Sequence, residues 1–179
     1  MAMIKDPLVY HYLDIGRLGR GEVVNLFLKD AGVEFKTVLY PWDATWPQQS
    51  ETLKNQGLTR TGKLPALEYK GDMMGKQARR NILWTLFRTS ILIGDEKKPE
   101  YKDKYVPEYY RLVAQYYSDF EGPYLLGDKI TYVDFAIYQS IDNDRRTGTL
   151  PSVLPEALLR FKEVFEKRPR ITDYIKQNE

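Results

Sequence analysis

The first forty residues alternate between strand-like and helix-like patterns of apolar and polar positions. Leu8–Leu13 is a short apolar and aromatic run rich in strand formers. Glu22–Ala31 repeats apolar residues at helical spacing, and Gly32 follows where a C′ glycine ends a helix. Val33–Tyr40 alternates apolar and polar residues, as a half-buried strand does. The predicted helical face comprises Val23, Leu26, Phe27 and Ala31. This order predicts a βαβ unit with a right-handed crossover.

The segment KLPALEYKGDMM predicts a second pair of strands. Two short strands are joined at Lys70-Gly71-Asp72, which is typical of an antiparallel hairpin. Pro65 has no backbone donor, so we expect it at the start of its strand. The preceding stretch, Pro41–Thr61, reads as an irregular connection with a helical turn near Gln48–Gln56.

Beyond Met74 the pattern becomes helical to the end of the sequence. In the second of these helices we expect one apolar face, made of Tyr109, Leu112, Val113, Tyr116 and Tyr117. The helical segments are Arg79–Ile93, Tyr105–Phe120, Thr131–Asp144, Pro155–Glu166 and Arg170–Gln177. The pattern therefore predicts an α/β part followed by an all-α part.

Composition excludes several classes of function. The formal net charge of the 179 residues is +2 and the basic residues are interspersed with acidic ones, so no footprint for nucleic acid stands out. No apolar run approaches the length of a membrane span, and residues 1–7 carry no signal-peptide core, so we expect a cytoplasmic protein. The absence of cysteine excludes disulfides, thiolate metal sites and a cysteine nucleophile. With His11 as the only histidine, we expect no metal site and no Ser-His-Asp triad.

The turn after the first strand is rich in glycine, as phosphate-binding loops are. Its glycines run Gly16-x-x-Gly19-x-Gly21, which is neither G-x-G-x-x-G nor followed by Gly-Lys-Ser/Thr. Glu22 at the start of the helix would also repel a phosphate. The sequence therefore disfavours a nucleotide site at this turn.

Two local motifs have structural interpretations. Thr131 stands three residues before Asp134 at the start of an apolar helix, which predicts reciprocal capping worth about 1 kcal/mol. The Leu64–Pro65 bond precedes a strand, where a cis bond would expose backbone groups to a peptide-like ligand. Only about 5–6% of X–Pro bonds are cis, so trans is the expectation from the residues alone.

Four segments, in order along the chain, resemble the cytosolic glutathione S-transferase family, tyrosine-type or fungal members included. They are GRGEVVNLFLKDAGVEF, GKLPALEYKGDMM, GPYLLGDKITYVDFAIY and RFKEVFEKRPRITDYI. The resemblance implies a thioredoxin-like βαβ-ββ domain with a mixed sheet, which binds glutathione, over residues 1–75. It implies an all-α domain, which binds the substrate, over residues 76–179. It also implies a homodimer.

The resemblance also assigns roles to residues. In tyrosine-type members a hydroxyl at the end of the first strand donates to the sulfur of glutathione, and Tyr12 occupies the matching place. Tyr10, on the same strand face, is the alternative; His11 points the other way. The resemblance implies Trp46, Lys54, Lys63, Leu64, Pro65 and Gln77 as glutathione-binding residues. Arg17, in a turn longer than the family pattern, is a candidate for the substrate pocket.

The main departure from the family follows Met74. Family members continue into a helix whose first turn binds the γ-glutamyl end of glutathione with Gln-Ser or Glu-Ser, whereas here Gln77 precedes Ala78. The chain is short for the family by one or two helices. Either the lineage lost them, or residues are missing from the sequence between 74 and 75; we favour the second, because losing the helix would strip one face of the sheet. An intact mass equal to the 21.0 kDa of the sequence would rule out missing residues.

The sequence predicts a glutathione-dependent enzyme acting on an electrophilic carbon of a small hydrophobic substrate. The outcome is conjugation, or cis–trans isomerisation with glutathione as cofactor, and a secondary metabolite is one candidate substrate. The alternative is a non-catalytic binding or assembly module of the same fold, in which the tyrosines serve packing.

Overall fold

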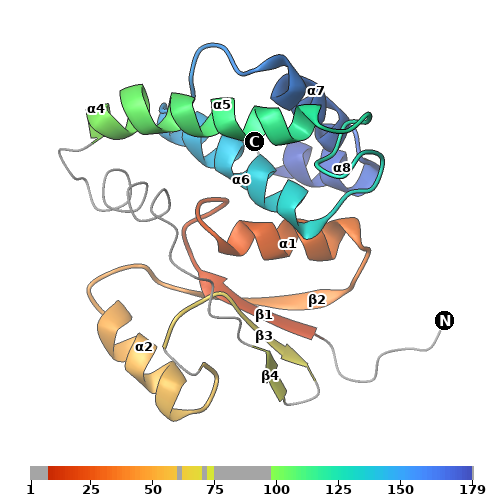
Figure 1. Ribbon diagram of the computed structural model, residues 1–179. Helices are drawn as coiled ribbons and strands as arrows, with labels where there is room; N and C mark the ends of the chain where they lie inside the picture. The colour runs from red at the N-terminus through yellow and green to blue at the C-terminus, as the bar shows by residue number, and fades with distance from the viewer. Residues whose placement is uncertain (1–7, 60–61, 70–71, 75–97, 179) are drawn as a thin grey trace. The chain divides into compact units, whose positions relative to one another are not determined.

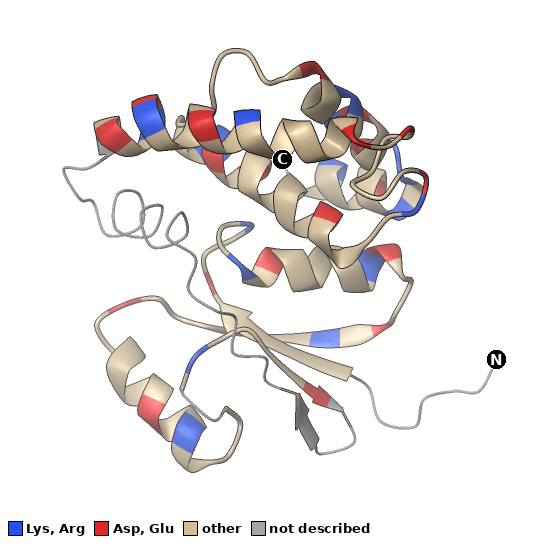
Figure 2. Ribbon diagram, in the orientation of Figure 1, with Lys and Arg blue, Asp and Glu red and all other residues tan. Residues whose placement is uncertain are grey.

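The computed structural model describes residues 8–59, 62–69, 72–74 and 98–178 (Figure 1). Contacts between residues divide the chain into two compact units, Met1–Gln77 and Ala78–Glu179. The first unit is α/β and the second is helical, as the sequence predicts. The predicted helix Arg79–Ile93 and the candidate Gln77 lie outside the described residues. Acidic and basic residues are interspersed along the described elements of both units (Figure 2).

The first unit is built on a mixed sheet with the strand order β2-β1-β3-β4. β1 pairs in parallel with β2 and antiparallel with β3, and β3 pairs antiparallel with β4. The parallel pair is the one expected for a βαβ unit, and the predicted hairpin is confirmed. Pro65 immediately precedes β3, as its missing donor requires. The strands are β1 (Leu8–Leu13), β2 (Phe35–Tyr40), β3 (Ala66–Tyr69) and β4 (Asp72–Met74).

Helices α1 (Gly21–Asp30) and α2 (Trp46–Asn55) lie on opposite sides of this sheet (Figure 1). Gly32 ends α1 with φ of 67° and its amide donates to the carbonyl of Lys29 at 2.9 Å, which confirms its predicted role. The predicted inward face of α1 is wrong in part, because Phe27 is 41% exposed whereas Leu28 is buried. Five of the six residues from 23 to 28 are apolar, so the helical period alone does not fix which stripe faces inward.

Strand β2 lies at the edge of the sheet and is more exposed than predicted. Val38 is 37% exposed and Leu39 is 52% exposed, and residues 36–39 are exposed throughout. Alternation of apolar and polar residues reports which side chains share a face. It does not report whether another element covers that face, so the expectation of a half-buried strand is wrong.

Aromatic side chains form the core of the helical unit. Phe165 stacks on Tyr138 with 4.3 Å between ring centroids and packs edge-on against Phe135 at 5.1 Å. Phe161 lies 4.9 Å from Tyr117. The helices described here are α4 (Lys98–Glu100), the π-helical turn η2 (Tyr101–Tyr105), α5 (Val106–Ser118), α6 (Tyr132–Thr147), α7 (Glu156–Glu166) and α8 (Pro169–Gln177). None of the described helices is long and apolar enough to cross a membrane.

The inward face of α5 differs in part from the predicted one, which included Tyr117. Tyr110 and Tyr117 are buried, whereas Leu112 is 42% exposed and Tyr116 is 63% exposed. Tyrosines occupy two adjacent stripes of this helix, so the hydrophobic pattern alone does not predict which stripe faces the core. The two buried phenols donate to buried carboxylates on α6, and these acceptors select the stripe.

One of those acceptors, Asp144, joins three parts of the helical unit. Its carboxylate is 1% exposed and accepts from Tyr101 at 2.8 Å, Tyr110 at 2.6 Å and Thr149 at 2.8 Å. Burial raises the pKa of Asp144, and the three hydroxyl donors lower it only in part. Tyr101 belongs to η2 and Tyr110 to α5, so the carboxylate joins both elements to α6.

We expect Asp144 to make the protein less stable as pH rises. Its pKa is raised in the folded state, so the folded protein keeps a proton that the unfolded chain has already lost. The free energy of unfolding therefore falls from about pH 4, the ordinary pKa of aspartate, and levels off above the folded pKa. Urea denaturation at a series of pH values measures this slope.

The matched variants are Asp144→Asn and Asp119→Asn, the latter at an exposed position. The difference in unfolding free energy between the wild type and Asp144→Asn should shrink as pH rises through this range. Asp119→Asn should leave the slope unchanged. A difference that stays constant with pH would contradict the raised pKa.

Candidate active site

Two tyrosines of β1 lie side by side on the face of the sheet that carries α1. Tyr10 is 3% exposed and Tyr12 is 5% exposed, and their rings stack with centroids 6.0 Å apart. Both lie against Gly21, the first residue of α1. A Cβ at this position would be 2.3 Å from the hydroxyl oxygen of Tyr10 and 2.3 Å from Cδ2 of Tyr12. The strand and the start of the helix therefore form one close-packed centre.

The Tyr12 hydroxyl points toward the turn that starts α1. It donates to the carbonyl of Leu18 over 3.4 Å, a long and weak bond. Burial raises the pKa of Tyr12 to about 12; the amides of Gly21 and Arg20 act in the opposite direction, and the carboxylate of Glu22 adds to the rise. Tyr12 is therefore a neutral phenol at physiological pH and keeps the proton it would donate.

The longer turn folds back on α1 through a buried ion pair. Arg17 is 6% exposed, and its Nε donates to Oε1 of Glu22 at 3.2 Å. Asn25 donates to the other carboxylate oxygen of Glu22 at 2.9 Å. Gly16 and Gly19 have φ of 60° and 82°, which the turn requires and glycine accepts without strain. Arg17 thus anchors the start of α1, a contact that sequence reasoning did not foresee.

Comparison with known proteins supplies the family. The family model for the glutathione S-transferase C-terminal domain matches residues 84–178, more than half of the chain. The chain belongs to the glutathione S-transferase family. A mouse protein named glutathione S-transferase Mu 2 is 36% identical over 86 residues, which are 47% of this chain and 37% of that protein. A glutathione S-transferase of Dermatophagoides pteronyssinus is 32% identical over 109 residues, 59% of this chain and 48% of that protein.

The chain thus spans less than half the length of these curated relatives. Solved structures extend the similarity of fold to nearly the whole chain. The structure named NaGST-2 aligns with a TM-score of 0.73 and 15% identity, over 97% of this chain and 98% of that one. A Pi-class glutathione S-transferase of Onchocerca volvulus aligns with a TM-score of 0.71 and 17% identity, over 95% of this chain and 92% of that one. These structures share the thioredoxin-like and all-α architecture.

The structure brings some of the residues implied by the family resemblance close to Tyr12. Leu64 and Pro65 are joined by a cis peptide bond, as the resemblance implies and against the base-rate expectation. Ala66, which follows them, pairs with His11 in the sheet. Pro65 therefore adjoins the end of β1 at Tyr12.

Other implied residues lie farther along the first unit. Trp46 begins α2, is half-buried, and packs against Trp42 with ring centroids 5.8 Å apart. Lys54 is exposed, with its Nζ 3.3 Å from Oε1 of Glu51. Lys63 is exposed in the loop before β3.

Gly21→Ala tests the packing of the tyrosine pair. In an ordinary helix this change stabilises by about 0.5–1 kcal/mol. Here the added Cβ would meet both phenols, so we expect the free energy of unfolding to fall by about 1–3 kcal/mol instead. Urea denaturation measures this loss of stability, and near-ultraviolet circular dichroism reports the packing of the tyrosine rings. A stabilised variant would contradict the close approach of α1 to Tyr10 and Tyr12.

No group of three or more His, Asp or Glu side chains arranged to hold a metal ion occurs among the described residues.

Proposed function

We propose that this protein is a glutathione-dependent enzyme in which Tyr12 stabilises the glutathione thiolate. Membership of the family supports glutathione as the thiol, since the curated relatives are named for it. The observation that carries the assignment is the neutral Tyr12 hydroxyl at the end of β1, against the first turn of α1. The thiolate attacks an electrophilic carbon of a small hydrophobic substrate.

The physical role of Tyr12 follows from thiol chemistry. A free thiol has a pKa of about 8.5 and is mostly protonated at neutral pH, whereas the thiolate is the nucleophile. A hydrogen bond donated to the sulfur favours the charged form and lowers this pKa. Exchange of the weak 3.4 Å bond to Leu18 for a bond to sulfur costs little. The amides of Gly21 and Arg20 place the positive end of the α1 dipole on the same side.

Tyr10 is the alternative donor. Its hydroxyl oxygen also lies near the start of α1, beside Gly21. Tyr12 is preferred because it is nearer the end of the strand and adjoins the Leu64–Pro65 segment. We assign glutathione binding to Trp46, Lys54, Lys63, Leu64, Pro65 and Gln77 on the family resemblance. Arg17 remains a candidate for contact with the substrate, because it lies in the turn between β1 and α1 that is longer than the family pattern.

Two reactions share the first step. In conjugation a carbon–sulfur bond forms and the leaving group departs with its electron pair, or the carbanion formed by addition takes a proton. In isomerisation the thiolate adds to a conjugated double bond, the resulting single bond rotates, and the sulfur leaves as the double bond reforms. Glutathione is consumed in the first reaction and regenerated in the second. Product mass separates them, because only conjugation leaves glutathione bonded to the product: addition gains its full mass, and substitution gains that mass less the departing acid HX.

A non-catalytic module is the alternative function, and one observation favours it. The Tyr12 hydroxyl is already bonded to its own chain, as a packing tyrosine would be. Retention of the protein on immobilised glutathione, followed by turnover of an activated chloroarene with glutathione, tests the proposal. We expect retention and glutathione-dependent release of chloride. A protein that does not bind glutathione would overturn the enzyme assignment.

We also propose a homodimer, on the family resemblance. Size-exclusion chromatography with light scattering should give twice the mass of one chain; a monomer at micromolar concentration would contradict it.

A further inference from the structure

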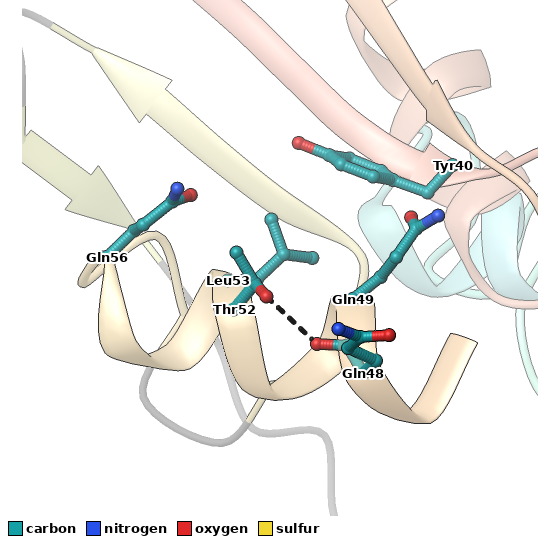
Figure 3. A pocket seen from close by; sticks show the side chains of 6 residues that line it. All are labelled: Tyr40, Gln48, Gln49, Thr52, Leu53 and Gln56. Atoms are coloured by element: carbon teal, nitrogen blue, oxygen red, sulfur yellow. Dashed lines mark hydrogen bonds between the residues drawn. The ribbon is translucent and has the colours of Figure 1, made fainter. Parts of the chain in front are cut away.

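A pocket lies on the α2 side of the sheet, away from the tyrosine pair. It has a volume of about 400 Å³ and is formed between α2 and the end of β2 (Figure 3). Successive side chains of a strand point to opposite faces, so His11 lies on the face opposite Tyr10 and Tyr12. Tyr40 contacts His11 and shares its face. The pocket lining comprises Tyr40, Gln48, Gln49, Thr52, Leu53 and Gln56.

The lining of this pocket carries hydrogen-bonding groups without charge. Three carboxamides, one hydroxyl and one phenol surround a single apolar side chain, Leu53, which is 4% exposed. Thr52 donates to the carbonyl of Gln48 at 3.0 Å, the dashed line in Figure 3. The carboxamides of Gln48 and Gln56 make no hydrogen bond with another described residue. A carboxamide offers both a hydrogen-bond donor and an acceptor, so these side chains can bind a ligand that also carries both.

The orientation of the Tyr40 hydroxyl is set from behind by His11. Nδ1 of His11 lies 3.0 Å from the Tyr40 oxygen, and the two rings stack with centroids 6.0 Å apart. Nε2 of His11 lies 3.5 Å from a carboxylate oxygen of Glu68, on β3. In the tautomer that carries its proton on Nε2, on the side of the carboxylate, Nδ1 accepts the hydrogen of Tyr40. The Tyr40 oxygen then presents a lone pair to the pocket. Burial raises the pKa of Tyr40, with a contribution from the charge of Glu68, so the phenol stays neutral.

Shape and chemistry together define the ligand. The face of the Tyr40 ring, above the buried Leu53, provides apolar contact for a flat ring, and the carboxamides provide donors and acceptors at its rim. A charged ligand would have no opposite charge among the lining residues and would lose hydration. We propose that this pocket is a second ligand site, which takes an uncharged planar ring bearing a carboxamide or an equivalent N–H and C=O pair. The proposal does not depend on the role of Tyr12, which lies on the opposite face of the sheet.

The only histidine of the chain makes the test specific. Nicotinamide is the probe, and nicotinate, the same ring with a carboxylate, is the matched control ligand. We expect nicotinamide to shift the His11 ring resonance in a saturable manner, because Tyr40 couples the pocket to Nδ1. We expect nicotinate to bind at least tenfold more weakly.

Variants locate the site. Tyr40→Phe keeps the ring and removes one acceptor, so the affinity for nicotinamide should fall about fivefold. Gln49→Ala should weaken binding to a similar degree. Asn55→Ala removes a carboxamide from an exposed position of the same helix, outside the lining, and should change nothing. The proposal is overturned if no saturable shift of His11 occurs, if nicotinate binds as well, or if Asn55→Ala weakens binding as much as Tyr40→Phe.

Discussion

Replacing Asp134 by alanine will lower the free energy of unfolding by about 3–5 kcal/mol, the largest effect on stability that we expect from one substitution. Asp134 is 0% exposed and accepts four hydrogen bonds. The amide of Thr131 donates at 2.7 Å and its hydroxyl at 2.8 Å; the amide of Leu125 donates at 2.9 Å and the hydroxyl of Tyr117 at 2.8 Å. The capping box predicted for the start of α6 is therefore present, and Asp134 also binds the amide of Leu125 and the hydroxyl of Tyr117 outside this helix.

The cost comes from the donors that remain. Each buried donor left without an acceptor costs roughly 1–3 kcal/mol, and the lost N-cap adds about 1 kcal/mol. Tyr117 is the most buried of these donors, at 1% exposure. In the wild type its pKa is raised by burial and by the bond to Asp134, so it stays a donor. Asp134→Asn keeps one acceptor oxygen and should cost about half as much as alanine.

A double-mutant cycle with Tyr117→Phe tests this explanation. In the wild type Tyr117→Phe should cost about 1 kcal/mol, because one hydrogen bond is lost. In the Asp134→Ala background the same change removes a donor that has lost its acceptor, so it should be neutral or stabilising. Asp173→Ala, at an exposed position of α8, is the control and should lie within about 0.5 kcal/mol of the wild type. Additive costs in the cycle would show that Tyr117 and Asp134 do not interact.

Local signals explain which parts of the fold were predictable. The bounds of β1, the hairpin and the capping of α6 depend on residues close together in the sequence, and all three are confirmed. The inward stripe of α5 depends on carboxylates that follow it by 17 and 34 residues, and no period within α5 contains that information. Contacts with residues distant in the sequence therefore determine which face of α5 is buried.

The same distinction applies to the candidate site. That Tyr10 and Tyr12 share a face follows from strand alternation alone. That Gly21 packs against both requires the register of α1 on the sheet, which the sequence does not reveal. The buried pair of Arg17 and Glu22 and the contact of His11 with Tyr40 likewise join separate elements. Residue type and the family pattern therefore predict candidate site residues, whereas the contacts between these residues are known only from the structure.

Replacing Tyr12 by phenylalanine should lower kcat/KM for glutathione conjugation by about a hundredfold. Removal of one donor to a developing or stabilised anion typically costs about 10²–10³ in rate. The pKa of the bound thiol should rise toward the value of about 8.5 for a free thiol, because the charged form loses its donor. The ultraviolet absorbance of the thiolate, followed against pH in the glutathione complex, measures this shift directly.

The matched control is Tyr10→Phe, which removes the hydroxyl of the neighbouring phenol on the same face. We expect it to change the thiol pKa much less than Tyr12→Phe does. Because both variants keep the ring against Gly21, urea denaturation should show similar stability, which separates chemistry from packing. A larger shift of the thiol pKa in Tyr10→Phe would show that Tyr10, and not Tyr12, donates to the thiolate. If glutathione binds and neither substitution moves the thiol pKa, the amides at the start of α1 stabilise the thiolate, and Tyr12 is a packing residue.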